Sequence, residues 1–119
     1  MEIRLFDKEK DYETLCGWWD DWGKPPHPKE ALSETGVIVS KDGVDICSGF
    51  IYSTDSYICW LEHLTSNKKL WLLLSEEQRL KILNKLGDAI FEKAKEMGFK
   101  LAFTLATEEQ DKKPGRHSN

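Results

Sequence analysis

The fold of this chain is decided by the stretch from Val37 to Ser53, which reads VIVSKDGVDICSGFIYS. Two runs rich in β-branched and aromatic residues flank Lys41-Asp42-Gly43. Because Asp-Gly supplies the positive φ angles of a tight turn, the stretch predicts two antiparallel strands joined as a hairpin. A second turn at Thr54-Asp55-Ser56 leads into a third strand, residues 57–64, and the result is a three-strand meander.

The residues before the meander predict a strand and a helix. Met1 to Phe6 alternates apolar and charged residues, and Asp7 is a suitable N-cap for a helix from Lys8 to Trp22 that Gly23 ends. Trp18, Trp19 and Trp22 lie at helical spacing, which is typical of core residues. The alternative is that they border a substrate cleft, with His27 of the stiff Pro25–Pro28 loop on its other side.

The residues after the meander predict a long helix and a last strand. Ser75 to Gln78 is typical of a capping box, and Gly98 is placed to end the helix. The apolar face of this helix is expected to consist of Leu80, Leu83, Ile90, Ala94 and Met97. A strand from Lys100 to Ala106 then pairs in parallel, because it follows a strand and a helix. Residues 68–74 fit a loop, a helical turn or a packing segment.

Length and composition limit the class of protein. With 119 residues we expect one domain over residues 1–107 and a polar tail over residues 108–119. The net charge of −4 argues against nucleic-acid binding through a basic face. No apolar run approaches the roughly 20 residues that span a bilayer, so we expect a cytoplasmic protein without membrane association.

The cysteines predict thiols rather than disulfides or a metal centre. Cys16, Cys47 and Cys59 are widely spaced, odd in number and surrounded by apolar residues, which is typical of buried reduced thiols. With His27, His63 and His117 they do not form the paired spacing of a zinc site. We therefore expect no metal.

The order of elements carries a family resemblance. Strand, helix, three-strand meander, long helix and strand follow one another, residues 78–86 open the long helix, and residues 94–98 close it. This arrangement resembles the GNAT acyltransferases. The resemblance implies an α/β fold with a mixed, mainly antiparallel sheet flanked by helices. It also implies transfer of an acetyl group from acetyl-CoA to an amine of a small molecule or a protein.

Short motifs along residues 1–107 make the resemblance more particular. They are Tyr12-x-x-Leu15-x-x-Trp18-Trp19, Pro25-Pro26-x-Pro28, Gly49-Phe50-Ile51-Tyr52, Thr54-Asp55-Ser56, Trp60-Leu61-Glu62 and Ser66-Asn67. As a set, they resemble a GNAT branch that bacteriophages and prophages often carry.

The resemblance places a cofactor site on two segments. In the family, a Gln/Arg-x-x-Gly-x-Gly/Ala motif binds the diphosphate of the cofactor, and here it falls on Gln78, Arg79, Leu80, Lys81, Ile82 and Leu83. Lys81 and Leu83 replace the two glycines that let backbone amides approach phosphates. The charge of Lys81 either compensates in part or simply faces solvent. The pantetheine arm is expected along the backbone of Leu61, Glu62, His63 and Leu64.

The same resemblance implies a catalytic base. Glu62 matches a carboxylate that takes the proton of the acceptor amine, and burial of a carboxyl raises its pKa toward the range this role needs. His63 is the alternative base, because imidazole titrates near neutral pH. The competing interpretation is that Glu62, which alternates with apolar Leu61, only faces solvent.

The end of the chain leaves the function open. In the family, a helix that often carries a tyrosine acid and a β-hairpin follow the last predicted strand, and residues 107–119 are too few and too polar for them. We therefore expect a C-terminally truncated fold with an exposed sheet edge, available to a homodimer or a host protein. One function is an acetyltransferase, with activity retained or degraded. The alternative is an inactive, phage-type GNAT derivative that binds and modulates a host protein, and a third interpretation is a shortened relative without selected activity.

Overall fold

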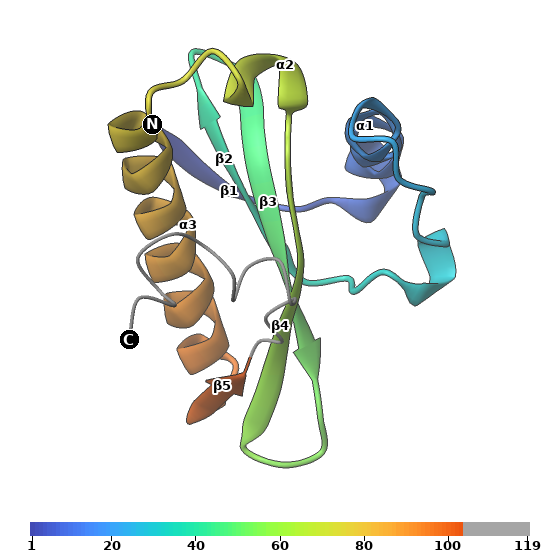
Figure 1. Ribbon diagram of the computed structural model, residues 1–119. Coiled ribbons are helices and arrows are strands. Elements are labelled where there is room, and N and C mark those ends of the chain that lie inside the picture. The colour runs from blue at the N-terminus through green and yellow to red at the C-terminus, as the bar shows by residue number, and fades with distance from the viewer. Residues whose placement is uncertain (104–119) are drawn as a thin grey trace, which may run out of the picture.

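The computed structural model describes residues 1–103 of the chain. A five-stranded sheet has a long helix on one face and a shorter helix on the other (Figure 1). The strands are β1 (Glu2–Leu5), β2 (Gly36–Lys41), β3 (Val44–Ser53), β4 (Ile58–Ser66) and β5 (Leu101–Phe103). The helices are α1 (Lys8–Asp21), α2 (Lys68–Trp71) and α3 (Glu76–Glu96), with a 3₁₀ turn at Lys29–Ala31.

The sheet is mixed and mainly antiparallel, as the sequence predicts. Its strands lie in the order β1-β2-β3-β4-β5; the first four pair antiparallel, and β5 pairs in parallel with β4. The meander and the parallel crossover through α3 are therefore confirmed. The predictions for residues 104–119, namely the end of the last strand, the tail and the missing helix and hairpin, lie outside the described residues.

Local signals set the ends of the elements where they were expected. Asp42 and Gly43 have φ angles of 53° and 80°, as the tight turn between β2 and β3 requires. Ser75 and Gln78 form both hydrogen bonds of a capping box at the start of α3, and Gly98 follows its end with φ of 95°. Residues 68–71 of the ambiguous segment form the short helix α2.

An ion-paired clamp joins three elements near the N-terminus. The Arg4 guanidinium of β1 donates to both carboxylate oxygens of Asp11 in α1, at 2.9 and 3.0 Å, and to Asp45 in β3 at 2.8 Å. Asp11 also accepts the backbone N–H of Asp7, the N-cap of α1. Burial raises the pKa of Asp11, but the hydrogen bonds from Arg4 and from the Asp7 N–H outweigh this, and the net pKa lies below its usual value.

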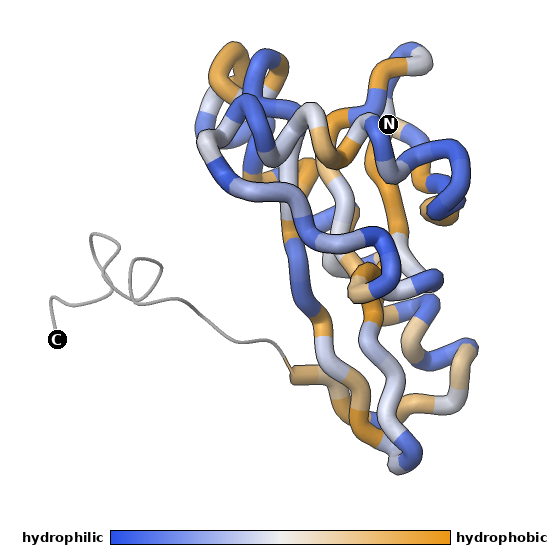
Figure 2. Tube along the Cα trace, turned by 90° about the vertical axis from the view of Figure 1, so that its right-hand side faces the viewer, coloured by the Kyte–Doolittle hydropathy of each residue, from blue (hydrophilic) through white to orange (hydrophobic). Residues whose placement is uncertain are grey.

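The face of the sheet under α1 has an aromatic core. Trp18 and Trp19 are buried there, which confirms their interpretation as core residues. Trp22 is partly exposed, and its indole N–H donates to the Ser66 carbonyl of β4 at 2.9 Å. The buried set of this face is Phe6, Leu15, Trp18, Trp19, Leu32, Ile38 and Phe50. The β3–β4 hairpin extends beyond α1, and Figure 2 shows this side of the molecule with hydrophobic segments along the hairpin.

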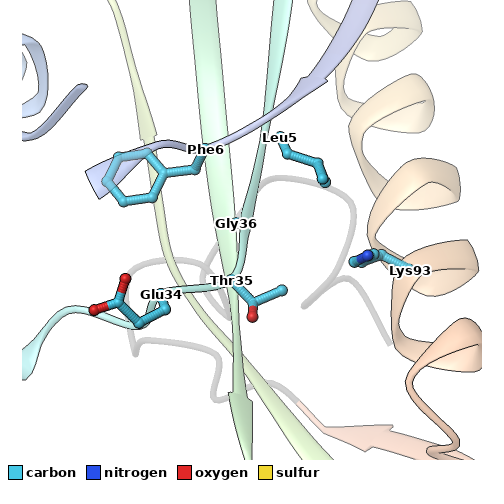
Figure 3. A pocket seen from close by; sticks show the side chains of 6 residues that line it. All are labelled: Leu5, Phe6, Glu34, Thr35, Gly36 and Lys93. Atoms are coloured by element: carbon cyan, nitrogen blue, oxygen red, sulfur yellow. The ribbon is translucent and has the colours of Figure 1, made fainter. Parts of the chain in front are cut away.

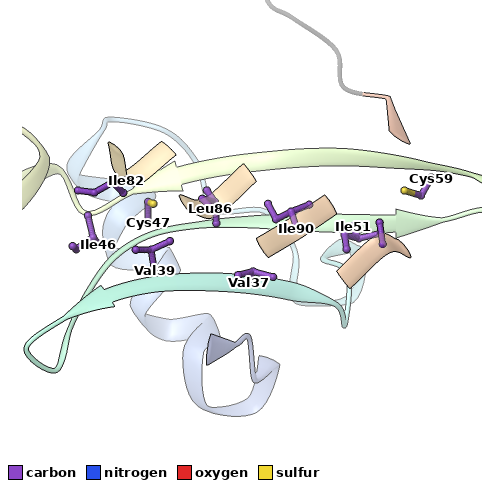
Figure 4. Packing of buried hydrophobic residues seen from close by; sticks show 10 residues of the cluster. Val37, Val39, Ile46, Cys47, Ile51, Cys59, Ile82, Leu86 and Ile90 are labelled. Carbon is purple, nitrogen blue, oxygen red and sulfur yellow. The ribbon is translucent and has the colours of Figure 1, made fainter. Parts of the chain in front are cut away.

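The opposite face packs against α3 (Figure 4). The buried helix residues are Ile82, Leu86, Ile90 and Ala94, four residues apart, and they contact Val37, Val39, Ile46, Cys47, Ile51 and Cys59 of the sheet. The predicted face was therefore wrong at Leu80 and Met97, which are 59% and 37% exposed. The predicted and observed faces share Ile90 and Ala94, but docking against the sheet buries Ile82 and Leu86 in place of Leu80 and Met97. Ile90 approaches the sheet closely, since a Cβ on Gly49 would lie 2.6 Å from Ile90 Cδ1.

The cysteines of the described residues are all free thiols. Cys47 and Cys59 are buried, and burial raises the pKa of Cys47 to about 12. Cys16 is only partly buried. No helix among residues 1–103 is long and apolar enough to cross a membrane.

The Arg4 clamp can be tested by its removal. Arg4→Met should lower the free energy of unfolding by about 1–3 kcal/mol, because Asp11 and Asp45 lose the cation they share. The measurement is urea unfolding followed by tryptophan fluorescence. Lys29→Met is the matched control, since its pair with Glu9 is exposed and should contribute under about 0.5 kcal/mol. Equal losses in the two variants would contradict the clamp.

Ser48 offers a second stability test. Its hydroxyl is fully buried in β3 and has no hydrogen-bond partner among residues 1–103. Ser48→Ala should leave stability unchanged or raise it by up to about 1 kcal/mol, since an unpaired buried hydroxyl is costly. Ser33→Ala is the contrasting control, because its hydroxyl donates to the Ile51 carbonyl at 2.5 Å, and it should destabilise by about 1 kcal/mol. If the melting temperature falls equally in both variants, the Ser48 hydroxyl is hydrogen-bonded in the folded protein and its assignment as unpaired is wrong.

Candidate functional site

A β-bulge in β4 organises the candidate site. Phe50 of β3 pairs with Glu62, and Ser48 pairs with Thr65, so that His63 and Leu64 together stand opposite Gly49. His63 has φ of 59°, the left-handed region that residues with a side chain seldom occupy. Such a conformation costs about 1–3 kcal/mol and persists only where the surrounding structure enforces it.

The bulge brings two consecutive side chains to one face of the sheet. In a regular strand, Glu62 and His63 would point to opposite faces. Here Glu62 lies across from Phe50, which belongs to the α1 side, and the His63 ring contacts Tyr52 of that same side at 5.4 Å between centroids. The structure thus brings together the two residues that the sequence offered as alternative bases. Leu61 packs toward α3 instead, and Leu64 is exposed.

His27 completes an aromatic cluster around His63. The imidazole rings of His27 and His63 are 3.9 Å apart between centroids and tilted by 51°. Trp19 of α1 meets the His27 ring edge to face at 4.8 Å. Trp19, His27, Tyr52 and His63 thus join α1, the proline loop, β3 and β4. The His27 ring packs directly against buried Trp19, in line with the core interpretation of that tryptophan, and the substrate cleft stays a prediction.

Two tyrosine hydroxyls hold the segment that carries His27. Tyr12 of α1 donates its hydroxyl to the His27 carbonyl at 2.6 Å. The Tyr52 hydroxyl accepts the backbone N–H of Ser33 at 3.2 Å and donates to the Ala31 carbonyl at 3.3 Å. Prolines 25, 26 and 28 restrict the same segment. The position of the His27 ring is therefore set by several contacts and not by its own side chain alone.

The cluster perturbs its ionisable groups. Burial lowers the pKa of His63, the positive charge of protonated His27 lowers it further, and the Glu62 carboxylate offsets part of this. Burial also raises the pKa of Tyr52, the Ser33 N–H opposes this, and Glu62 adds to the rise. His63 is consequently neutral near pH 7, which leaves a ring nitrogen able to accept a proton.

The backbone of β4 beside the site has one open side. β5 pairs only with Ile58, Cys59 and Trp60. From Leu61 to Leu64, where the sequence predicts the pantetheine arm, β4 therefore has no strand partner on its β5 side among residues 1–103. Strand edges without a partner offer N–H and C=O groups at regular intervals to an extended chain.

The second predicted cofactor segment lies elsewhere. Residues 78–83 occupy the first turns of α3, which covers the face of the sheet opposite Glu62. Ile82 is buried in the core there, Leu83 is half-buried, and Leu80 and Lys81 are exposed. Gln78 is engaged in the capping box, and Arg79 donates its Nε–H to the Trp71 carbonyl at 2.9 Å.

Two hollows lie outside the Glu62–His63 site. One of about 180 Å³ opens between the β1–β2 region and α3, with Lys93 extending from α3 toward Thr35 and Gly36 (Figure 3). The other, about 450 Å³, lies beside β5 and is lined by Phe91, Ala94, Lys95, Phe99, Lys100, Leu101 and Ala102. No group of three or more His, Cys, Asp or Glu residues within residues 1–103 is placed to hold a metal ion.

Comparison with known proteins identifies the fold. Neither a scan against protein-family models nor a search of curated proteins finds a match. Among solved structures, the chain is similar to an aminoglycoside acetyltransferase from an uncultured soil metagenomic sample, with a TM-score of 0.66, 14% identity, and coverage of 92% of this chain and 80% of the other. The fold is that of the GNAT acetyltransferases.

Two further solved structures support this assignment. A GNAT family acetyltransferase of Staphylococcus aureus matches with a TM-score of 0.59 and 17% identity, over 92% of this chain and 88% of the other. N-acetylglutamate synthase of Neisseria gonorrhoeae, complexed with coenzyme A and N-acetyl-glutamate, matches with a TM-score of 0.64 and 13% identity, over 93% of this chain and 27% of the other. At these identities the likeness establishes the fold.

Sequence reasoning missed the role of Tyr52 within this GNAT fold. Tyr52 both supports the Ser33 segment and contacts His63, yet in the sequence it is one aromatic residue in a strand. It also missed the bulge, because residues 57–64 are rich in strand-forming residues and contain no glycine or proline to mark an irregularity. The aromatic residues on both sides of the hairpin turn are the only sequence signal that the two strands share a cluster.

The contact between His27 and His63 predicts a measurable titration. By NMR, His63 should titrate below the ordinary value of about 6.5. In His27→Phe, the ring contact remains but the neighbouring charge is lost, so the pKa of His63 should rise. The folded state lowers the pKa of His63, so neutral His63 contributes its full stabilisation above its ordinary, unfolded pKa. This contribution to the free energy of unfolding is lost as the pH falls toward the lowered pKa of the folded state. An unchanged His63 titration in His27→Phe would disprove the electrostatic contact.

Proposed function

We propose that this protein transfers an acyl group from a thioester, with acetyl-CoA as the reference donor, to an amine of a small molecule or a protein. The GNAT fold and the named acetyltransferases that share it support this function. The observation that carries the proposal is the bulge in β4. It places Glu62 and His63 on one face, beside the stretch of β4 that β5 leaves open.

The residues of the site supply proton transfer and orientation. An ammonium group has to lose a proton before its nitrogen can attack a thioester carbonyl, and the thioester supplies an activated acyl group with a thiolate leaving group. Glu62 is the proposed proton acceptor, and neutral His63 is the adjacent group able to receive the same proton. The ring contacts of His63 with His27 and Tyr52 restrict its orientation.

The function can be tested by thiol release from acetyl-CoA in the presence of lysine, spermidine, glucosamine and an N-terminal alanine peptide. Glu62→Gln should lower kcat/KM by about 10²-fold or more, because it keeps the shape but removes the proton acceptor. Asp55→Asn, in the exposed β3–β4 turn, is the matched carboxylate control and should retain full activity. A folded wild type that releases no thiol with any of these amines would contradict the proposal.

The pH profile separates the two candidate bases. If His63 accepts the proton, kcat/KM should fall as the pH falls through the lowered pKa of His63, and His63→Phe should lose both activity and this pH dependence. If Glu62 accepts it, activity should be lost in Glu62→Gln and retained in His63→Phe. Wild-type rates in both variants would show that neither residue of the bulge takes part in the reaction.

A second candidate function is binding of another protein through the sheet edge. The apolar hollow beside β5 favours it, since Phe91 and Leu101 are exposed there and Lys95 and Lys100 flank them. In the phage-type branch that the sequence resembles, the partner would be a host protein, and a second copy of the chain is the other occupant. Light scattering over a concentration series tests the homodimer, and Leu101→Glu should abolish any dimer formed at this edge.

A further inference from the structure

The start of α3 is closed by the chain itself. The Ser75 hydroxyl accepts the Gln78 N–H at 3.1 Å, and the Gln78 side-chain oxygen accepts the Ser75 N–H at 2.8 Å. The Arg79 N–H bonds back to the Ser75 carbonyl. A phosphate at a helix start is normally held by free N–H groups of the first turn. At α3, the capping box uses one donor of this kind, the Gln78 N–H, together with the N–H of the N-cap residue Ser75.

The charge at this helix end opposes an anion. Glu76 and Glu77 occupy the first turn, and both are exposed. Carboxylates at this place stabilise a helix, because they meet the positive end of its dipole. For the same reason they compete with any phosphate that approaches, and two negative charges repel it.

The nearby cations are engaged by the protein. Arg79 donates its Nε–H to the Trp71 carbonyl and lies 5.8 Å from the centre of the Trp71 ring. The Lys81 ammonium is 4.0 Å from a Glu77 carboxylate oxygen. Arg79 would have to leave the Trp71 carbonyl to bind a phosphate here, whereas Lys81 forms only an exposed pair with a carboxylate that itself repels the phosphate.

The backbone of α3 is also shielded by side chains. From Ser75 to Leu86 every residue has a Cβ, and Gly87 is the first glycine of the helix. Ile82 is held in the core and cannot turn outward. The close approach of a phosphate to the backbone that glycines permit is therefore blocked.

The open side of β4 offers a contrast. Residues 61–64 have no β5 partner among the described residues, and Glu62 and His63 lie at this point. Backbone groups of this kind bind an extended amide-containing chain regardless of its charge. The part of a donor that carries the thioester therefore meets a suitable surface, whereas its adenosine diphosphate end does not.

We propose that the chain recognises its acyl donor through the pantetheine arm and not through the adenosine diphosphate. This inference rests on the proposed acyltransferase function and adds a donor class to it. The ligand is an acyl-pantetheine thioester, whatever group follows the arm. The capping box, the two first-turn glutamates, the contact of Arg79 with Trp71 and the absence of glycine from the first turns of α3 carry the inference.

Titration calorimetry on the full chain tests this donor class with three probes. Acetyl-pantetheine and acetyl-CoA should bind with dissociation constants within about threefold of each other, and adenosine 3′,5′-bisphosphate should give no heat at millimolar concentration. An acetyl-CoA affinity more than about thirtyfold above that of acetyl-pantetheine would overturn the inference and leave the proposed function intact. Absence of binding by both thioesters would overturn the proposed function itself, and the inference with it.

Paired variants show which residues at the start of α3 disfavour the adenosine diphosphate end of acetyl-CoA. Glu76→Gln with Glu77→Gln should strengthen acetyl-CoA binding by about threefold at low salt and leave acetyl-pantetheine unchanged, because it removes the repulsion alone. Glu92→Gln with Glu96→Gln, in the second half of α3, is the matched charge control and should change neither. A tenfold loss of acetyl-CoA binding in Lys81→Gln, with acetyl-pantetheine unaffected, would reveal a diphosphate contact and overturn the inference.

Discussion

The structure depends on how closely α3 approaches the backbone of β3 at Gly49. On one face, Ile90 of α3 lies so near that a Cβ at Gly49 would be 2.6 Å from its Cδ1, so that a side chain there would force Ile90 to shift. Along its edge, the same residue stands opposite the bulge of β4. One backbone position therefore contacts both the helix that covers the core and the bulge that carries His63. The hydrophobic core and the candidate site thus meet at Gly49, next to the left-handed backbone of His63.

The features that sequence could predict are those with local causes. Asp42-Gly43, the Ser75–Gln78 capping box and the Gly98 stop depend only on near neighbours, and each lies where it was expected. The buried stripe of α3 could not be settled in this way, because Leu80 and Ile82 are both apolar and only docking against the sheet selects one. Glu62 and His63 could be named from the resemblance. Their joint position could not, since a bulge is a property of two paired strands.

The start of α3 illustrates a competition between stability and binding. The N–H groups that would hold an anion are also the groups that an isolated helix end needs to satisfy. In this chain the Ser75 side chain satisfies one of them, the Gln78 N–H, and the first-turn glutamates complement the dipole. The same helix supplies Ile82, Leu86, Ile90 and Ala94 to the core, so a firmly capped α3 contributes to the whole fold. A hydrogen bond that caps this end of the helix uses an N–H group that is then not available to a ligand.

The strand order has a consequence for how the chain is made. Because each strand pairs with the one before it in sequence, the sheet can grow during synthesis without waiting for a distant partner. The layer formed by α3 comes late, more than twenty residues after β3 is complete. Until then Val37, Val39 and Ile51 form an uncovered hydrophobic surface. Nascent chains that pause before residue 96 would therefore be a natural substrate for chaperones and a point of vulnerability to aggregation.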